Sequence, residues 1–221
     1  MAQMKTPGVY IIEKNAFPNS VVEVATAIPA FIGHTQFARD GNKDLTGIPF
    51  RISSMAEFHS FFGFAPTLRF GIRPEDSESE DTTNDINVLF PDGSCQLTLP
   101  KTFYALYYNM LLFYANGGGP CYIVSVGDYE HDFKSIDFTN ALLALKKEQE
   151  PTLVVVPEAV YMEEGDCYKV QTAALMHCGN DMKNRFAILD VFNGYKDENG
   201  AGIKSFRENI GSNFLAYCAS Y

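Results

Sequence analysis

The sequence predicts an α/β protein with a mainly parallel or mixed central sheet flanked by helices. Short runs of β-branched and aromatic residues alternate along the chain with amphipathic segments of helical spacing. The runs lack strict apolar–polar alternation, which is typical of strands buried on both faces. Strands that alternate with helices in this way favour a parallel sheet covered on both faces. Four runs carry the prediction: residues 28–33, 121–126, 153–156 and 186–191.

Residues 1–20 are predicted to form an extended arm outside the core. Residues 9–12 have strand-forming composition behind the turn Pro7-Gly8, and Pro18-Asn19 separates them from the apolar residues 21–27. No second strand follows at the spacing of a hairpin. The arm is therefore expected to pair either with a distant strand of its own chain or with another chain.

Residues 21–63 are predicted to form the first part of the core domain. Residues 28–33 and 49–53 have the composition of short strands, and Ser54 and Glu57 have the spacing of a capping box that begins a helix. The helical spacing that follows places three phenylalanines on one side, where core packing is expected in preference to ligand stacking. These are Phe58, Phe61 and Phe62.

Residues 64–101 are predicted to form an insertion at the surface. Residues 75–85 are acidic and rich in hydroxyl groups, with few apolar side chains. Such composition is typical of a mobile, solvated loop. Calcium binding is the alternative interpretation, but the order of ligands and glycine found in an EF-hand loop is missing.

Residues 102–221 are predicted to continue the α/β core. Apolar residues at helical spacing predict a helix over 103–114, with Thr102 as its cap, and residues 117–119 are a glycine triplet that ends it. Phosphate-binding loops instead follow a strand and open a helix, so the triplet is interpreted as a structural turn.

The last part of the core is predicted to alternate helices with strands. One helix begins at a cap, Asp137, and another runs from Gly165 to Gly179, while residues 193–202 are expected to be a loop. Residues 214–221 are apolar and stop without a turn or cap. The chain is therefore expected to be the N-terminal portion of a longer protein.

Charge and composition exclude several classes of partner. A formal net charge of −10 and a pI near 4.8 disfavour unassisted binding to nucleic acid or to an anionic membrane, because phosphate repels such a surface. No apolar run is long enough for membrane insertion. Five cysteines without a C-x-x-C pattern predict reduced thiols in a protein made in the cytoplasm. Four scattered histidines without metal-ligand spacing predict neither a metal nor a cofactor.

Asp190 is the strongest candidate for a catalytic residue. It lies at the C-terminal end of a predicted buried strand, where open α/β sheets bind ligands. With Cys178 or Cys218 it could serve a soluble α/β hydrolase, which is the alternative function. The competing interpretation is that Asp190 caps local backbone N–H groups. Because no complete set of nucleophile, base and oxyanion donors is present, an enzyme is not expected.

Several motifs occur in a characteristic order. They are residues 6–10, 29–33, 49–54 leading into 57–58 and 62–63, 116–118 with 121–124, 153–157, and 185–190. In this order they resemble the contractile tail sheath family of phages and phage-like contractile injection systems. The resemblance covers almost the whole chain except 64–101, a region where sheath proteins carry variable insertions. The resemblance fits the sheaths of phage tails, secretion systems and extracellular injection particles alike.

The resemblance implies a structural subunit without catalysis. Such subunits polymerise helically around an inner tube and contract to drive the tube through a target membrane. The implied partners are other sheath subunits, the inner tube protein, and baseplate and tail-terminator or cap proteins, without nucleic acid. The protein would be made in the bacterial cytoplasm and assembled in a phage tail or phage-like contractile particle.

The resemblance also gives the N-terminal arm a role. In this family the arm adds a strand to a neighbouring subunit, so that main-chain hydrogen bonds join the two chains. This role explains why the arm has no local partner in the sequence. The residues implied in inter-subunit strand addition are Thr6, Pro7, Gly8, Val9, Tyr10, Ile11 and Ile12.

Overall fold

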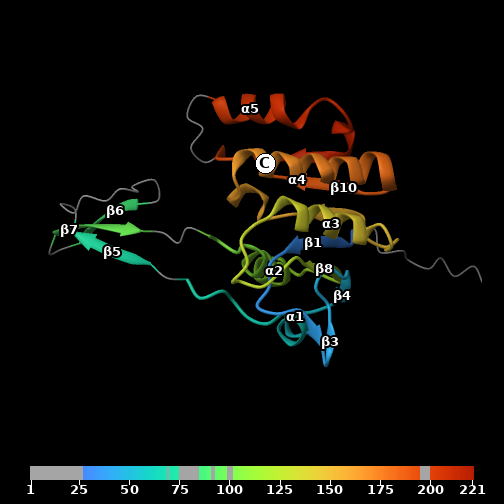
Figure 1. Ribbon diagram of the computed structural model, residues 1–221, viewed down its shortest axis with the longest axis horizontal. Helices are drawn as coiled ribbons and strands as arrows, with labels where there is room; N and C mark the ends of the chain where they lie inside the picture. Colours follow the sequence, from blue (N-terminus) through green and yellow to red (C-terminus); the bar gives the residue numbers. More distant parts are fainter. Residues whose placement is uncertain (1–26, 69, 75–84, 91–92, 99–101, 195–199) are drawn as a thin grey trace, which may run out of the picture.

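A six-stranded mixed sheet forms the centre of the protein (Figure 1). The computed structural model describes residues 27–68, 70–74, 85–90, 93–98, 102–194 and 200–221. The strands of the sheet are β1 (Pro29–Gly33), β4 (Phe50–Ile52), β8 (Cys121–Ser125), β9 (Leu153–Val155), β10 (Phe186–Leu189) and β11 (Cys218–Ser220). Their order in space is β11-β10-β9-β1-β8-β4, and all neighbours are parallel except β4 and β8. The sheet and its flanking helices confirm the predicted fold class.

The path of the chain through the parallel strands reverses at β1. From β1 the chain passes by way of β4 to β8, and then crosses back to β9 on the other side of β1. It continues outward in the same direction to β10 and β11. With β4 left aside, this is the strand order of flavodoxin-like folds, which bind ligands where the order reverses. The corresponding position in this protein lies between β1 and β9.

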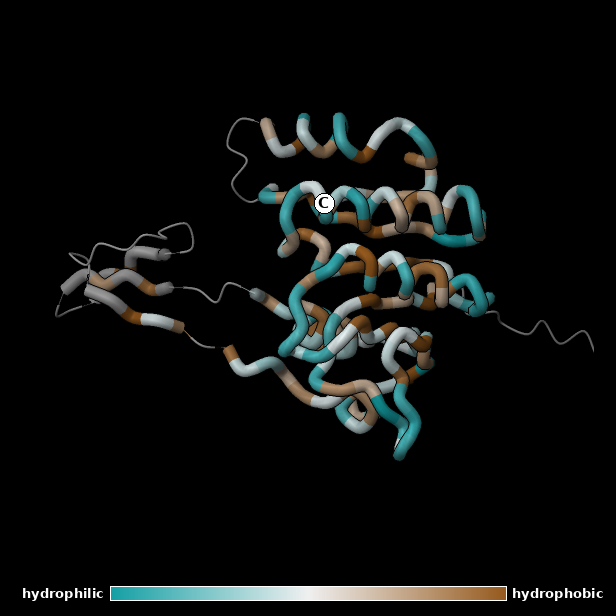
Figure 2. Tube along the Cα trace, in the orientation of Figure 1, coloured by the Kyte–Doolittle hydropathy of each residue, from teal (hydrophilic) through white to brown (hydrophobic). Residues whose placement is uncertain are grey.

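Helices cover the two faces of the sheet unequally. In the described residues they are α1 (Met55–Phe62), α2 (Leu106–Ala115), α3 (Ser135–Leu145), α4 (Glu164–Met176) and α5 (Ala201–Ile210). Side chains of β1 point alternately to the two faces. Ile32 therefore packs in the core with α3, α4 and α5, whereas Phe31 packs in the core with α1 and α2. Figure 2 shows the hydrophobic residues concentrated along the strands and the inner sides of the helices.

The face with α1 and α2 is covered only in part. Val154 and Ala187 are buried on the face with α3, α4 and α5, but their neighbours Leu153, Val155 and Ile188 are only half-buried. The sequence predicts full burial of β9 and β10 on both faces. Among the described residues, α1 and α2 cover β1, β8 and β4, so the second face of β9 and β10 stays partly open.

Helix α1 forms as its sequence predicts, whereas α2 begins later than predicted. The hydroxyl of Ser54 accepts a hydrogen bond from the backbone N–H of Glu57 at 3.2 Å, which confirms the cap. Gly63 ends α1 with a φ of 87°, a conformation that glycine adopts without steric cost. Helix α2 begins at Leu106 without a side-chain cap, so the prediction that Thr102 caps it was wrong.

Several elements are absent from the sequence-based prediction, which gives residues 193–202 as a loop. Helix α5 and strand β11 follow residues 195–199, and a short hairpin of β2 (Arg39–Asp40) and β3 (Lys43–Asp44) precedes β4. Helix α4 continues as a π-helix, η2 (His177–Met182), which ends at Lys183 with a φ of 60°. Among the described connections are two short 3₁₀ turns, η1 (Ala159–Tyr161) and η4 (Leu215–Tyr217).

A separate antiparallel sheet lies between β4 and α2 in the sequence and projects away from the main sheet (Figure 1). It consists of β5 (Gly71–Pro74), β6 (Asp85–Phe90) and β7 (Gly93–Thr98). Strand β7 lies in the middle, antiparallel to both neighbours. Residues 75–84, for which mobility is predicted, lie outside the described residues. No helix in the described part of the chain is long and apolar enough to cross a bilayer.

Candidate functional site

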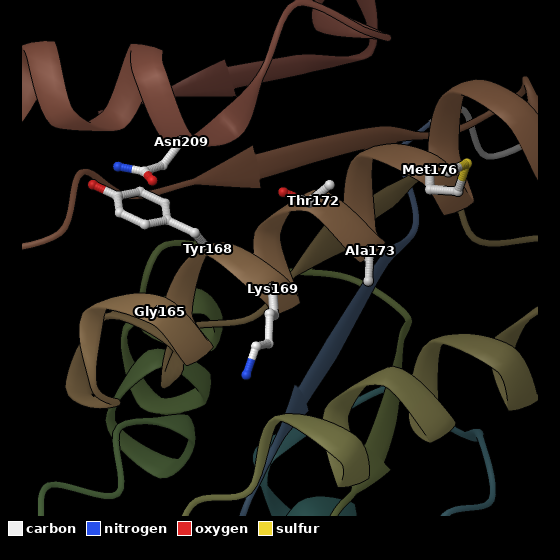
Figure 3. A pocket seen from close by; sticks show the side chains of 7 residues that line it. All are labelled: Gly165, Tyr168, Lys169, Thr172, Ala173, Met176 and Asn209. Atoms are coloured by element: carbon white, nitrogen blue, oxygen red, sulfur yellow. The ribbon is translucent and has the colours of Figure 1, made fainter.

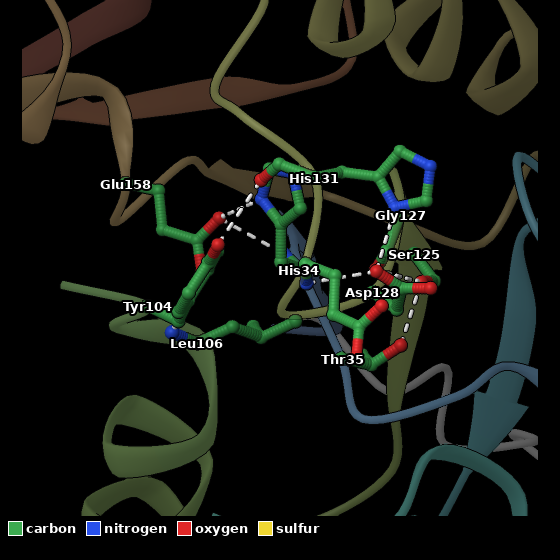
Figure 4. Close-up of polar contacts among 10 residues, drawn as sticks. His34, Thr35, Tyr104, Leu106, Ser125, Gly127, Asp128, His131 and Glu158 are labelled. Carbon is green, nitrogen blue, oxygen red and sulfur yellow. Dashed lines mark hydrogen bonds and ion pairs between the residues drawn. The ribbon is translucent and has the colours of Figure 1, made fainter. Parts of the chain in front are cut away.

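A buried pair, His34 and Glu158, occupies the point where the strand order reverses (Figure 4). His34 directly follows β1, and Glu158 lies three residues beyond β9, so both come from the carboxyl ends of adjacent parallel strands. Their side chains are 1% and 0% exposed. Nδ1 of His34 lies 2.8 Å from Oε2 of Glu158, and the same oxygen accepts the backbone N–H of His34 at 2.9 Å. The pair links the ends of β1 and β9 directly.

The second carboxylate oxygen of Glu158 caps helix α2. Oε1 accepts the backbone N–H of Leu106 at 3.2 Å, and α2 has no cap from its own N-terminal side chains. The first N–H groups of a helix lack partners within it, and their dipoles favour a negative charge. In open α/β folds this is the kind of position that receives a ligand phosphate. In this protein the chain's own carboxylate takes the place of the anion.

Gly33 makes the close approach of Glu158 possible. A Cβ atom on Gly33 would lie 2.9 Å from Cβ of Leu106 and 3.0 Å from Cδ of Glu158. Contacts this short would force the backbone or the carboxylate to move. Glycine is therefore required here for space.

Aromatic rings enclose the imidazole of His34. The ring centroids of Phe133, Tyr104 and Phe138 lie 4.9, 5.3 and 5.7 Å from that of His34. Burial, followed by the negative charge of Glu158, raises the pKa of the Tyr104 hydroxyl. The phenol therefore stays protonated at neutral pH and donates a hydrogen bond to the carbonyl of His131 at 3.1 Å. The rings exclude solvent from the pair.

A polar surface pocket of about 520 Å³ lies beside the pair, at the end of β8. The hydroxyl of Ser125 in its lining lies 2.6 Å from that of the buried Thr35, and Nδ1 of His131 lies 2.6 Å from Oδ1 of Asp128 (Figure 4). The hydrogen bond with His131 lowers the pKa of Asp128. In the part of the chain that the structure describes, no group of three or more His, Cys, Asp or Glu side chains could hold a metal ion.

A second buried polar group joins η2 to the end of α3. Arg185 is 2% exposed, and its guanidinium donates to the carbonyls of Leu145 and Glu148. Its Nη1 also lies 2.8 Å from Nε2 of His177. Burial, followed by the charge of Arg185, lowers the pKa of His177 to about 4, so the imidazole is neutral at pH 7 and accepts this hydrogen bond. Arg185 thus supplies the positive charge that a helix C-terminus favours.

Asp190 lies at the end of β10, as predicted, and its side chain is exposed. Partial desolvation raises the pKa of its carboxyl. The backbone carbonyl of Asp190 accepts a hydrogen bond from Nε2 of Gln171 at 2.7 Å. The thiol whose pKa responds to the Asp190 charge is that of Cys167, not those of Cys178 or Cys218, which the hydrolase alternative names.

The buried thiols are poor nucleophiles. Burial raises the pKa of Cys121 to about 11, and of Cys167 and Cys178 to about 12 each. Burial also raises the pKa of Cys218. A catalytic cysteine needs the opposite shift, because the thiolate is the reactive form. The geometry around Asp190 therefore lends no support to a cysteine hydrolase.

A shallow pocket of about 560 Å³ lies between α4 and α5 (Figure 3). Tyr168 and Asn209 lie side by side at one end, and Met176 lies at the other. Lys169 is the positive charge in the lining, and its Nζ donates to Asp166 at 2.7 Å. With this charge paired, the pocket has no set of polar groups that converge on a ligand.

The residues that meet where the strand order reverses are absent from the candidates predicted from the sequence. Gly33 ends a predicted buried strand, and His34 and Glu158 follow two such strands, so the rule that singles out Asp190 applies to them equally. Residues 6–12, implied in strand addition, lie outside the described residues.

Comparison with known proteins gives a structural likeness. No protein-family model and no curated protein matches the sequence. Among solved structures, a chain in the cryo-EM structure of the anti-feeding prophage (AFP) baseplate in contracted state is similar, with a TM-score of 0.57 and 17% identity. The match covers 99% of this chain and 47% of that chain, so this protein spans about half the length of its neighbour. The likeness shows that the two chains share a fold.

Proposed function

We propose that the protein is a structural subunit of a contractile tail sheath. Such a subunit polymerises helically around an inner tube and contracts to drive the tube through a target membrane. The observation that carries the proposal is the fold shared over 99% of the chain with a chain of the AFP baseplate structure. That likeness supports a structural component of a contractile injection particle. The order of the motifs from residue 6 to residue 190 supports the narrower role in the sheath.

The proposal includes the absence of catalysis. In flavodoxin-like folds the ligand crevice lies at the strand reversal, and in this protein Glu158 fills that position with three backbone and side-chain contacts. A carboxylate held at the N-terminus of α2 would repel a phosphate there. The point where the strand order reverses therefore serves to fix β1, β9 and α2 relative to one another. This suits a subunit that must stay rigid while the sheath contracts.

Strand addition by the N-terminal arm needs an open edge on a neighbouring subunit. Among the described strands, β4 and β11 are the edges of the main sheet. Arg51 in β4 pairs with Glu150 at 3.2 Å, and charged side chains on an edge oppose pairing with another strand. Strand β11 carries the small, neutral residues Cys218, Ala219 and Ser220. We therefore assign β11 as the acceptor edge for residues 6–12 of a neighbour.

The proposed partners and location follow from the same role. The partners are other sheath subunits, an inner tube protein, and baseplate and tail-terminator or cap proteins. The protein is made in the bacterial cytoplasm and assembles in a phage tail or phage-like contractile particle. Neither nucleic acid nor direct membrane insertion is part of the proposal.

Deletion of residues 1–14 from the full-length protein tests the proposed assembly. The arm should be dispensable for the fold but required for the polymer. The melting temperature should therefore stay close to that of the intact protein, while sedimentation shows subunits in place of polymers. Polymers that still form without the arm, or a body that unfolds without it, would contradict strand addition.

A further inference from the structure

An apolar groove of about 460 Å³ runs across the partly open face of the sheet. Its floor consists of Phe31, Val155 and Ile188, one residue from each of the adjacent strands β1, β9 and β10. Leu112 of α2 forms one wall and is 65% exposed. Exposed apolar surface that is concave and continuous with a core is typical of a site that another segment covers.

The lining of the groove selects for an uncharged, apolar occupant. None of the described residues that line it carries a charge, and its polar side chains are the carboxamides of Asn109 and Asn116. A small-molecule site usually has several polar groups that converge to fix one orientation. Nδ2 of Asn109 and of Asn116 each donates to a carbonyl of α2 or its cap, so their Oδ1 atoms are left to accept a backbone N–H of an extended peptide as it passes.

The groove begins where residue 26 joins the described chain. Ala27 itself lines the groove, two residues before β1 begins at Pro29. The seven residues 20–26, if extended, span up to about 25 Å. The two strand spacings from β1 to β10 amount to only about 10 Å. Residues 20–26 can therefore cross the groove from its attached end.

We propose that residues 20–26, Ser-Val-Val-Glu-Val-Ala-Thr, lie in this groove of their own chain and complete the core beneath β9 and β10. In an extended segment Val22 and Val24 point to one side, and Val21, Glu23 and Ala25 to the other. The two valines enter the apolar groove, and Glu23 faces solvent. This intramolecular contact is separate from the proposed strand addition by residues 6–12, and it does not depend on a sheath function.

A pair of matched double variants of the full 221-residue chain tests which side of the segment is buried. V22D/V24D places two carboxylates on the side that enters the groove, and V21D/A25D places two on the opposite side. The dye ANS fluoresces on exposed apolar surface. V22D/V24D should raise ANS emission several-fold, whereas V21D/A25D should match the unmodified chain. Equal emission from the two variants, at any level, would overturn the proposal.

Cross-linking tests whether the segment lies in its own groove. In a chain with C95S and C218S, which removes the partly exposed thiols, V22C or V24C is combined with L112C and treated with a short bismaleimide. The expected product is a monomer whose cross-linked peptide joins the segment to α2, formed faster than with the control V21C/L112C. A cross-linked dimer would mean that the segment lies in the groove of a second copy. The absence of a cross-link from both variants would mean that the segment does not lie in the groove. Either result overturns the proposal.

Discussion

Oε2 of Glu158 lies 2.8 Å from Nδ1 of His34, and the other oxygen of the same carboxylate caps α2 at Leu106. One buried side chain therefore joins the ends of two central strands to the start of a helix on one face of the sheet. In a flavodoxin-like fold this is where a ligand would bind. The protein uses the position for internal stability.

Removal of the carboxylate should strongly destabilise the fold. Glu158→Ala leaves three N–H donors without their acceptor, and breaking a buried polar pair of this kind costs about 3–5 kcal/mol. Glu158→Gln keeps one acceptor oxygen and should cost roughly 1–3 kcal/mol. Urea unfolding measures both. Glu163→Ala is the control, because Glu163 is exposed and its side chain makes no capping hydrogen bond.

The vacated position in Glu158→Ala should accept a small anion. Formate or acetate can meet the N–H of Leu106 and the imidazole of His34, so either salt should raise the melting temperature of the variant. Chloride at equal ionic strength is the control. If chloride stabilises the variant as much as formate does, the carboxylate has no specific role at this position.

Alanine substitutions at Gly33 and Gly165 should differ in their effect on stability, because only Gly33 has close neighbours. Gly33→Ala places a methyl group 2.9 Å from Leu106 and should cost about 1–3 kcal/mol by overpacking. At Gly165, in the first turn of α4, an added Cβ meets nothing within 4 Å. Gly165→Ala should therefore be neutral or stabilising by up to about 1 kcal/mol. Thermal unfolding compares the two, and an equal effect would contradict the close approach at Gly33.

The free energy of unfolding should fall between pH 6.5 and pH 4 because of His177. The folded state lowers the pKa of this imidazole from 6.5 to about 4, so below pH 6.5 the unfolded chain binds the proton more readily. The contribution is fully present above pH 6.5, and it falls by up to about 3 kcal/mol as the pH drops to 4. His177→Gln should remove this pH dependence. Asp181 and Lys146 also face His177, and the lowered pKa of Asp181 confines its own effect to lower pH.

Three of the five thiols should resist alkylation in the native protein. Cys121, Cys167 and Cys178 are buried, and their pKa values of about 11 to 12 keep them protonated at pH 8. Cys95 and Cys218 are partly exposed and should react with iodoacetamide first, as peptide mass spectrometry will show. Rapid alkylation of Cys178 at neutral pH would revive the hydrolase alternative, which a loss of turnover in Asp190→Asn would then support.

Much of the fold could be predicted because local patterns determine it. Uninterrupted apolar runs identify β1, β8, β9 and β10, and the spacing of Ser54 and Glu57 identifies the start of α1. Helix α5 could not be predicted from its apolar pattern because it buries only Phe206 and Ile210. Thr102 does not cap α2, because the cap comes from Glu158, 52 residues beyond Leu106.

The candidate site could be predicted only in part, because it depends on which strands are neighbours. The sequence places His34 and Glu158 after buried strands, but it does not show that β9 crosses back to lie beside β1. That crossing brings together two residues 124 positions apart. Arg185 is a similar case, because its role as a cap for α3 depends on the return of the chain from η2 to β10.

Negative-stain electron microscopy of the purified full-length protein tests the central claim most directly. A sheath subunit should form hollow tubes of uniform diameter. The double variant Val9→Pro/Ile11→Pro, which removes two backbone N–H donors from the arm, should form no tubes while its circular dichroism spectrum stays unchanged. The conservative variant Val9→Ile/Ile11→Val should still form tubes. Discrete, monodisperse particles from the unmodified protein at every concentration, together with thiol-sensitive turnover of a substrate, would contradict a sheath and indicate an enzyme.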